Sequence, residues 1–133
     1  MKVRAFVLSA CVLLPASAVA ASDAVNEDWV LKAKETHSFS FTLPASTPVR
    51  VDLTPISHAD KGVTMRIVPA EDFDACRGAA QGQCRSRGEF DGFAVRSFSH
   101  TGTLPPGRWT FFVTNSENIL ERATVHVHLV FNP

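Results

Sequence analysis

The sequence lacks an apolar run long enough to cross a membrane as a helix. Such a helix needs about 20 consecutive apolar residues, whereas the main apolar stretch, Ala5 to Leu14, is much shorter and lies at the N-terminus. An excess of one charge is also missing, because 13 lysines and arginines balance 13 aspartates and glutamates. Proteins that bind nucleic acids by charge carry a basic surplus. We therefore predict neither a transmembrane segment nor a nucleic-acid partner.

The sequence also lacks the motifs of a nucleophilic enzyme. No serine is flanked by the glycines of a nucleophile elbow. Ser99 and His100 are adjacent, but neighbouring residues of a strand point to opposite faces and cannot form a catalytic pair. We therefore predict that the protein is not an enzyme and requires no cofactor.

The N-terminus has the pattern of a secretory signal peptide. Lys2 and Arg4 precede the apolar stretch, and Ala18 to Ala20 supplies the small residues of a cleavage site. We predict a signal at residues 1–20 and a periplasmic or extracellular domain at residues 21–133, long enough for one core and too short for two. The alternative is a lipoprotein anchored at Cys11, although the apolar stretch before that residue is short.

Cysteine is scarce, with three residues in the whole sequence. Cys11 leaves with the signal, so the mature chain retains Cys76 and Cys84. In an oxidising compartment this even number favours a disulfide that closes a short loop. Two free thiols are the alternative.

Period-two alternation of apolar and polar residues dominates the mature chain and predicts strands with one buried face. A convincing helical period is missing, so we predict an all-β fold: a single antiparallel, jelly-roll-like β-sandwich of about seven strands with one disulfide-stapled loop. In the sixth strand Trp109 and Phe111 share the core face. Phe112 points the other way, where it is either a contact residue or covered by a loop. The alternating segments are residues 29–33, 39–43, 49–53, 63–67, 93–98, 109–113 and 123–131.

Residues 69–92 break this rhythm and form a long excursion between two strands. Long ordered loops in compact domains are often functional, so this excursion is our main candidate for a binding surface. A solvated, variable insertion is the alternative. We expect Phe73 and Phe90 to anchor it. The charged residues expected at its surface are Asp72, Asp74, Arg77, Arg85 and Arg87.

The order of these pieces resembles the bacterial pre-peptidase C-terminal type of β-sandwich domain. The similar pieces are the aromatic strand with Phe39 and Phe41, the strand Val49 to Leu53 after a proline turn, and the run Leu104 to Val113, in which a glycine turn leads into an aromatic strand. The resemblance implies a jelly-roll-like sandwich. The acidic element that helps this family bind calcium has only one aspartate here, in residues 60–67. Calcium binding is therefore not carried over.

His126 and His128 form the sharpest pair of potential metal ligands. Residues two apart on a strand share a face, so both imidazoles could reach one ion. A third ligand would have to come from another strand, such as His37 or His100. The alternative is that both histidines simply face solvent. The leading hypothesis is thus a non-catalytic interaction module that binds a protein or an envelope carbohydrate, and the alternative is a periplasmic metal-binding protein.

Overall fold

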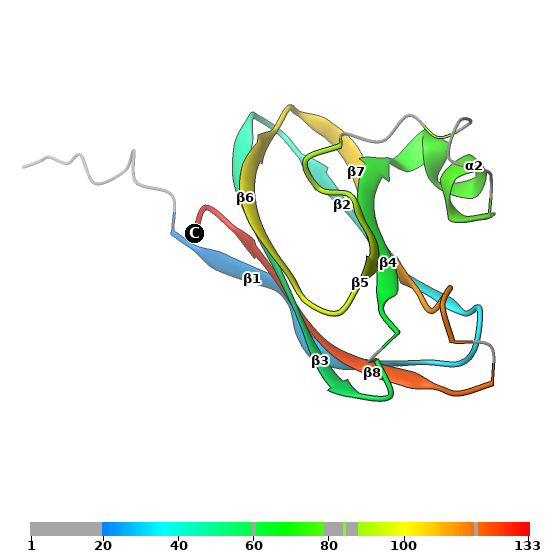
Figure 1. Ribbon diagram of the computed structural model, residues 1–133. Coiled ribbons are helices and arrows are strands. Elements are labelled where there is room, and N and C mark those ends of the chain that lie inside the picture. The colour runs from blue at the N-terminus through cyan, green and yellow to red at the C-terminus, as the bar shows by residue number, and fades with distance from the viewer. Residues whose placement is uncertain (1–19, 60, 79–83, 85–87, 119) are drawn as a thin grey trace, which may run out of the picture.

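The protein folds as an antiparallel β-sandwich of two four-stranded sheets, as the computed structural model in Figure 1 shows. The structure describes residues 20–59, 61–78, 84, 88–118 and 120–133. The predicted signal, apart from Ala20, lies outside these residues, as do Arg85 and Arg87. One sheet, here the β1 sheet, has the order β1 (Ser22–Leu31), β8 (Ala123–Phe131), β3 (Thr47–Ser57) and β6 (Phe98–Leu104). The other, the β2 sheet, has the order β2 (Thr36–Leu43), β7 (Gly107–Thr114), β4 (Val63–Pro69) and β5 (Gly92–Val95).

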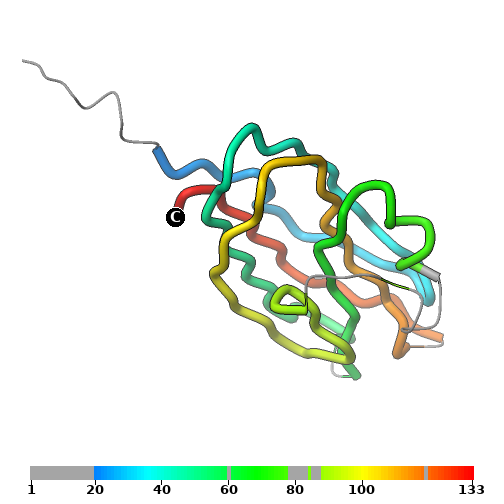
Figure 2. Tube along the Cα trace, turned by 90° about the horizontal axis from the view of Figure 1, so that it is seen from above, coloured from blue at the N-terminus to red at the C-terminus, as the bar shows by residue number. Residues whose placement is uncertain are grey.

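This strand order confirms the all-β sandwich predicted from the alternation. Sheets ordered 1-8-3-6 and 2-7-4-5 have the arrangement of a jelly roll, in which the first and last strands pair. Figure 2 shows these two strands, blue and red, side by side along one sheet. The side chains predicted to point inward fill the space between the sheets. Fully buried examples are Val49, Val51, Val63, Met65, Ile67, Phe111, Val125, Val127 and Leu129.

The structure corrects the expectation of a single strand at residues 93–98. β5 ends at Val95 in the β2 sheet, and β6 begins at Phe98 in the β1 sheet, so the chain crosses between sheets at that point. Ala94 adopts a left-handed φ of 53°, which breaks the regular strand geometry before the crossing. Its backbone lies against Gly62, where a Cβ atom would be 2.5 Å from the Ala94 carbonyl carbon. Glycine is therefore needed at position 62.

The excursion after β4 contains two short helical elements, η3 (Ala70–Asp72) and α2 (Phe73–Gly78). Figure 1 shows α2 on the outer face of the β2 sheet, away from the β1 sheet. It covers a second apolar cluster that contains Val68, Phe112 and Cys76, with Phe73 packed against it. The predicted disulfide between Cys76 and Cys84 is present and joins α2 to the segment that follows. Of the two expected anchors, Phe90 is fully buried in the main core, whereas Phe73 belongs to this second cluster.

This cover corrects the expectation that Phe112 is a contact residue. Phe112 is 1% exposed and lies beneath α2, so the covered alternative is the right one. Phe111, its neighbour in β7, is fully buried in the main core. β7 is therefore buried on both faces.

No helix in the part of the chain that the structure describes is long and apolar enough to span a membrane.

Candidate functional site

An open groove runs along the outer face of the β2 sheet between α2 and β5. Its volume is about 260 Å³, and apolar atoms of Cys76 and Phe112 contribute to its lining. We call it the α2 groove. Its lining residues are Thr64, Arg66, Cys76, Arg77, Phe93, Ala94, Phe112, Thr114, Ser116 and Glu117.

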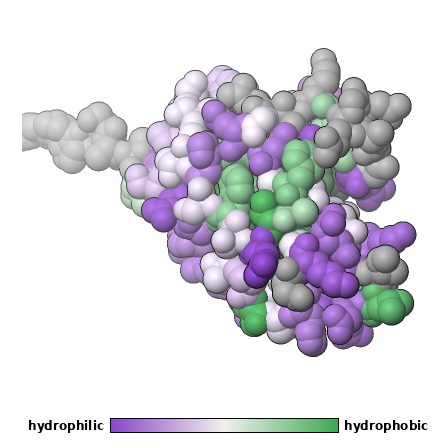
Figure 3. Space-filling model, viewed as in Figure 1, coloured by the Kyte–Doolittle hydropathy of each residue, from purple (hydrophilic) through white to green (hydrophobic). Residues whose placement is uncertain are grey.

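The β5 side of the α2 groove continues into an apolar part of the surface. Figure 3 shows hydrophobic surface gathered near the centre of the view, between β5 and β6, with hydrophilic surface around it. Phe93 of β5 lines the groove and is 40% exposed, and Val95 and Phe98, which pack against the main core, are half-buried. Exposed apolar surface rimmed by polar residues is typical of contact sites.

Arg66 is the most unusual residue of the α2 groove. It lies on β4 directly opposite Phe112 of β7, and only 5% of its side chain is exposed. Its guanidinium stacks over the ring of Phe93, with the central carbon 4.8 Å from the ring centroid. Its Nε donates to Oδ1 of Asp91 at 3.4 Å. A buried charge therefore lines one wall of the groove and is held in place by an aromatic ring.

Arg77, one of the charged residues expected at the surface of the excursion, lines the same groove from α2. Its guanidinium stacks over Phe73, 5.3 Å from the ring centroid, and Phe73 in turn packs edge-on against Phe112. Nη2 of Arg77 lies 3.5 Å from Oδ1 of Asp74, and the two side chains are 52% and 86% exposed. Such an exposed ion pair is weak, so Arg77 remains available to a ligand.

The other predicted residues of the excursion are placed differently. Asp74 lies beside Arg77 at the rim, and Asp72 lies half-buried in η3. Arg85 and Arg87 lie outside the described residues. The structure therefore brings Arg77, Asp74 and Cys76 together near the groove and adds Arg66, which was not among the predicted site residues.

The far end of the α2 groove is rich in hydroxyl groups. Oγ1 of Thr64 and Oγ of Ser116 are 3.0 Å apart, and Ser116 donates to Glu117 at 3.0 Å. Oγ1 of Thr114 lies 2.7 Å from Oγ1 of Thr36 across the β7–β2 ladder. The groove thus changes from arginine and aromatic side chains at one end to hydroxyls and a carboxylate at the other.

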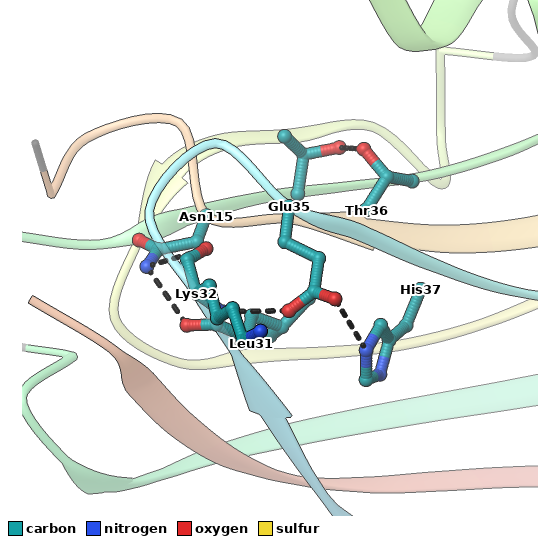
Figure 4. Close-up of polar contacts among 7 residues, drawn as sticks. Leu31, Lys32, Glu35, Thr36, His37 and Asn115 are labelled. Atoms are coloured by element: carbon teal, nitrogen blue, oxygen red, sulfur yellow. Dashed lines mark hydrogen bonds and ion pairs between the residues drawn. The ribbon is translucent and has the colours of Figure 1, made fainter.

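Asn115 fixes the loop from which Ser116 and Glu117 reach the groove. It is fully buried, and its Nδ2 donates to the carbonyl oxygens of Leu31, Lys32 and Glu121 at 3.0 to 3.2 Å. Figure 4 shows the side chain of Asn115 reaching the turn between β1 and β2. The sequence indicated only a turn at this position. The buried amide in fact joins two loops that lie far apart in sequence.

Glu35 stabilises the same turn from the outside. Its Oε1 accepts the backbone N–H of Lys32 at 2.7 Å, and its Oε2 lies 3.6 Å from Nε2 of His37 (Figure 4). The hydrogen bond from the Lys32 backbone, helped by the charges of His37 and Lys32, lowers the pKa of the Glu35 carboxyl below its ordinary value of 4.5.

His126 and His128 lie on the outer face of the β1 sheet, on the opposite side of the molecule from the α2 groove. Nδ1 of His126 is 2.7 Å from Oδ1 of Asp28, and its Nε2 is 2.7 Å from Oδ1 of Asn26. Nε2 of His128 is 2.8 Å from Oδ1 of Asp23. Three of the four imidazole nitrogens therefore already have polar partners on β1.

The expected third metal ligands do not reach this face. His37 packs edge-on against Trp29, and His100 packs edge-on against the core residue Phe90. Within the described ranges, no group of three or more histidine, cysteine, aspartate or glutamate side chains is arranged to hold a metal ion. No observation of the structure therefore favours the metal-binding alternative over the α2 groove.

No family model matches the sequence, and no curated protein matches it. Solved structures do share the fold. The pre-peptidase C-terminal domain of a collagenase from Bacillus anthracis superposes with a TM-score of 0.52 and 11% identity, over 79% of this chain and 89% of that domain. The periplasmic inhibitor of g-type lysozyme from Aeromonas hydrophila superposes with a TM-score of 0.55 and 15% identity, over 84% of this chain and 86% of the inhibitor. The resemblance to the pre-peptidase C-terminal type of sandwich is thus confirmed as a likeness of fold.

Proposed function

We propose that this protein is an exported, non-catalytic interaction module that binds another protein through the α2 groove. The observation that carries the proposal is the composition of the groove, in which two guanidinium groups stacked on aromatic rings flank buried apolar side chains. Arginine and aromatic residues are enriched in protein interfaces, and a few of them supply most of the binding energy.

Two further observations support an exported binding protein. The signal pattern at residues 1–20 and the Cys76–Cys84 disulfide fit an oxidising compartment outside the cytoplasm. One protein with this fold is a periplasmic inhibitor of g-type lysozyme. A small sandwich of this shape is therefore sufficient to present a protein-binding surface.

The groove favours a protein over an envelope carbohydrate. A sugar ring stacks on an exposed aromatic face, but Phe112 is buried and Arg66 covers one face of Phe93. The disulfide limits the freedom of α2, so less conformational entropy is lost when a partner binds.

Site-specific cross-linking in the native envelope tests this proposal. A photo-reactive amino acid is placed at position 117, at the end of the α2 groove, or at position 101, on the exposed outer face of the β1 sheet. We expect a discrete protein adduct at position 117 only. The adduct should disappear with Arg77→Ala and persist with Arg108→Ala, a control on an exposed residue of the same sheet outside the groove. The same variants are tested for binding to purified g-type lysozyme.

Two outcomes would show that the groove is not the binding surface. One is an adduct at position 101 alone, and the other is an adduct at position 117 that persists with Arg77→Ala. Binding of purified peptidoglycan without any protein adduct would favour the carbohydrate alternative.

A further inference from the structure

We infer that the α2 groove selects a carboxylate side chain of its partner, and that Arg66 is the residue that determines this specificity. The inference rests on the proposed function, since it names the chemistry that the same groove recognises.

The ion pair of Arg66 with Asp91 is long for a side chain that is so little exposed. A guanidinium has five N–H donors. The 3.4 Å contact from Nε to Asp91 is longer than the 2.7 to 2.9 Å usual for a charge-assisted bond. The Arg66 side chain is only 5% exposed, so this long contact with Asp91 holds a guanidinium that has little access to water. Burying a charged group is costly unless it is closely paired, so a ligand that brings a carboxylate closer to Arg66 would bind favourably.

Both arginines of the groove lie over aromatic rings. Arg66 lies over Phe93 and Arg77 lies over Phe73, at 4.8 and 5.3 Å from the ring centroids. Stacking uses the flat face of a guanidinium and leaves its N–H edges for hydrogen bonds in the plane. Both arginines line the same groove, and the planar, two-oxygen shape of a carboxylate matches the fork of N–H donors that a guanidinium presents.

The lining of the groove carries more positive than negative charge. Its charged lining residues are Arg66, Arg77 and Glu117. Glu117 belongs to the hydroxyl-rich end, on the loop after β7, so the positive charge lies toward α2 and β5. Asp74, which contacts Arg77, is 86% exposed and competes weakly with a ligand that is shielded from water. An acidic side chain next to an apolar one would satisfy the arginines and also contact Phe93, which lines the groove and is 40% exposed.

The test uses benzoate as a probe, because it joins a carboxylate to an apolar ring. The side-chain Nε–H signals of arginine are followed by NMR during titration of the folded protein. We expect saturable shifts of the Arg66 and Arg77 signals with benzoate and none with benzamide, which has the same shape without the charge. The Arg108 signal is the internal control, since this exposed residue lies outside the groove.

The Arg66→Lys variant separates the contribution of the planar guanidinium from the contribution of the positive charge. Arg66→Lys keeps the positive charge near Asp91 but removes the planar donor edge, and we expect about tenfold weaker benzoate binding. Arg108→Lys should leave the affinity unchanged. If Arg66→Lys fails to fold, the comparison of benzoate with benzamide on the wild-type protein still decides whether the groove selects a carboxylate.

Equal shifts with benzamide, equal shifts of the Arg108 signal, or no shift at any benzoate concentration would overturn the inference. Tighter binding of phenylphosphonate than of benzoate would also overturn it, because the site would then select phosphate. A failed titration with a positive cross-link at position 117 would remove only the carboxylate specificity. A saturable titration without a cross-link at position 117 would support carboxylate recognition and contradict the proposed protein partner.

Discussion

The outer faces of the two sheets are built from the same alternating pattern but have opposite characters. On β8 the outward residues His126 and His128 are half-buried and bond to polar groups of β1. On β7 the outward residues Thr110 and Phe112 are 2% and 1% exposed. The difference comes from α2, which packs over the β2 sheet, whereas no described helix packs over the β1 sheet. Strand alternation thus determines which residues share a face. A separate segment, here α2, determines whether that face is exposed to solvent.

Substitution of two neighbouring phenylalanines of β7 should have the largest effect and tests whether both faces of this strand are buried. Phe111→Ala should lower the free energy of unfolding by about 3 to 5 kcal/mol, and Phe112→Ala by about 2 to 4 kcal/mol, since the smaller cluster beneath α2 can relax more easily around a cavity. Urea unfolding followed by circular dichroism measures both values. A loss below about 1 kcal/mol for Phe112→Ala would mean that its face is solvated like that of β8.

The disulfide should matter for one face and not for the other. Replacing Cys76 and Cys84 together by serine should cost about 2 to 3 kcal/mol, because the unfolded chain regains the freedom of a short loop. Hydrogen exchange should accelerate in η3 and α2, while the amides of β8 keep their protection. Equal acceleration in both sheets would contradict a stapling role confined to the β2 face.

The histidines of the solvated face should contribute little. Replacing His126 and His128 together by glutamine should change the free energy of unfolding by less than about 1 kcal/mol, as is usual for partly exposed polar contacts. Zinc or copper affinity, measured by calorimetry, should be the same before and after the change. Micromolar metal binding that vanishes in the variant would instead make this face the functional one.

The smallest effect is expected at Glu35, in the turn that connects the two sheets. Its lowered pKa means that the ionised form stabilises the folded state, so the contribution is complete above pH 4.5 and is lost as the pH falls through the folded pKa. Wild-type protein and Glu35→Gln should therefore differ slightly in thermal midpoint at pH 7 and converge at low pH. A difference that grows on acidification would show that the sign is wrong.

Much of the fold could be predicted from the sequence, because a sandwich core is encoded by local alternation. The same pattern could not predict the crossing between β5 and β6, since it depends on the left-handed conformation of Ala94 against Gly62. The alternation also predicted that β7 is buried on one face, whereas the structure buries both of its faces. Val68, an apolar residue on the outward side of β4, was the available signal that the face is covered.

The candidate site was harder to predict than the fold. Arg77 could be expected from its place in the excursion, but Arg66 reads as an ordinary outward residue of a strand. Its burial depends on Phe93 and Asp91, which are brought to it only when β5 pairs with β4. Sequence spacing contains no direct record of such contacts.

The pairing of β1 with β8 has a consequence for how the chain reaches its native state. Asp28 and His126, which face each other across this pair, are 98 positions apart in sequence. Closing so large a loop costs entropy before any contact repays it, and proteins dominated by such contacts fold in milliseconds to seconds. Because β8 also supplies the neighbour of β3, the β1 sheet cannot be completed until the last strand is available. An unfinished chain would expose the unpaired edge of β3 and depend on the timing of its synthesis or transport for protection from aggregation.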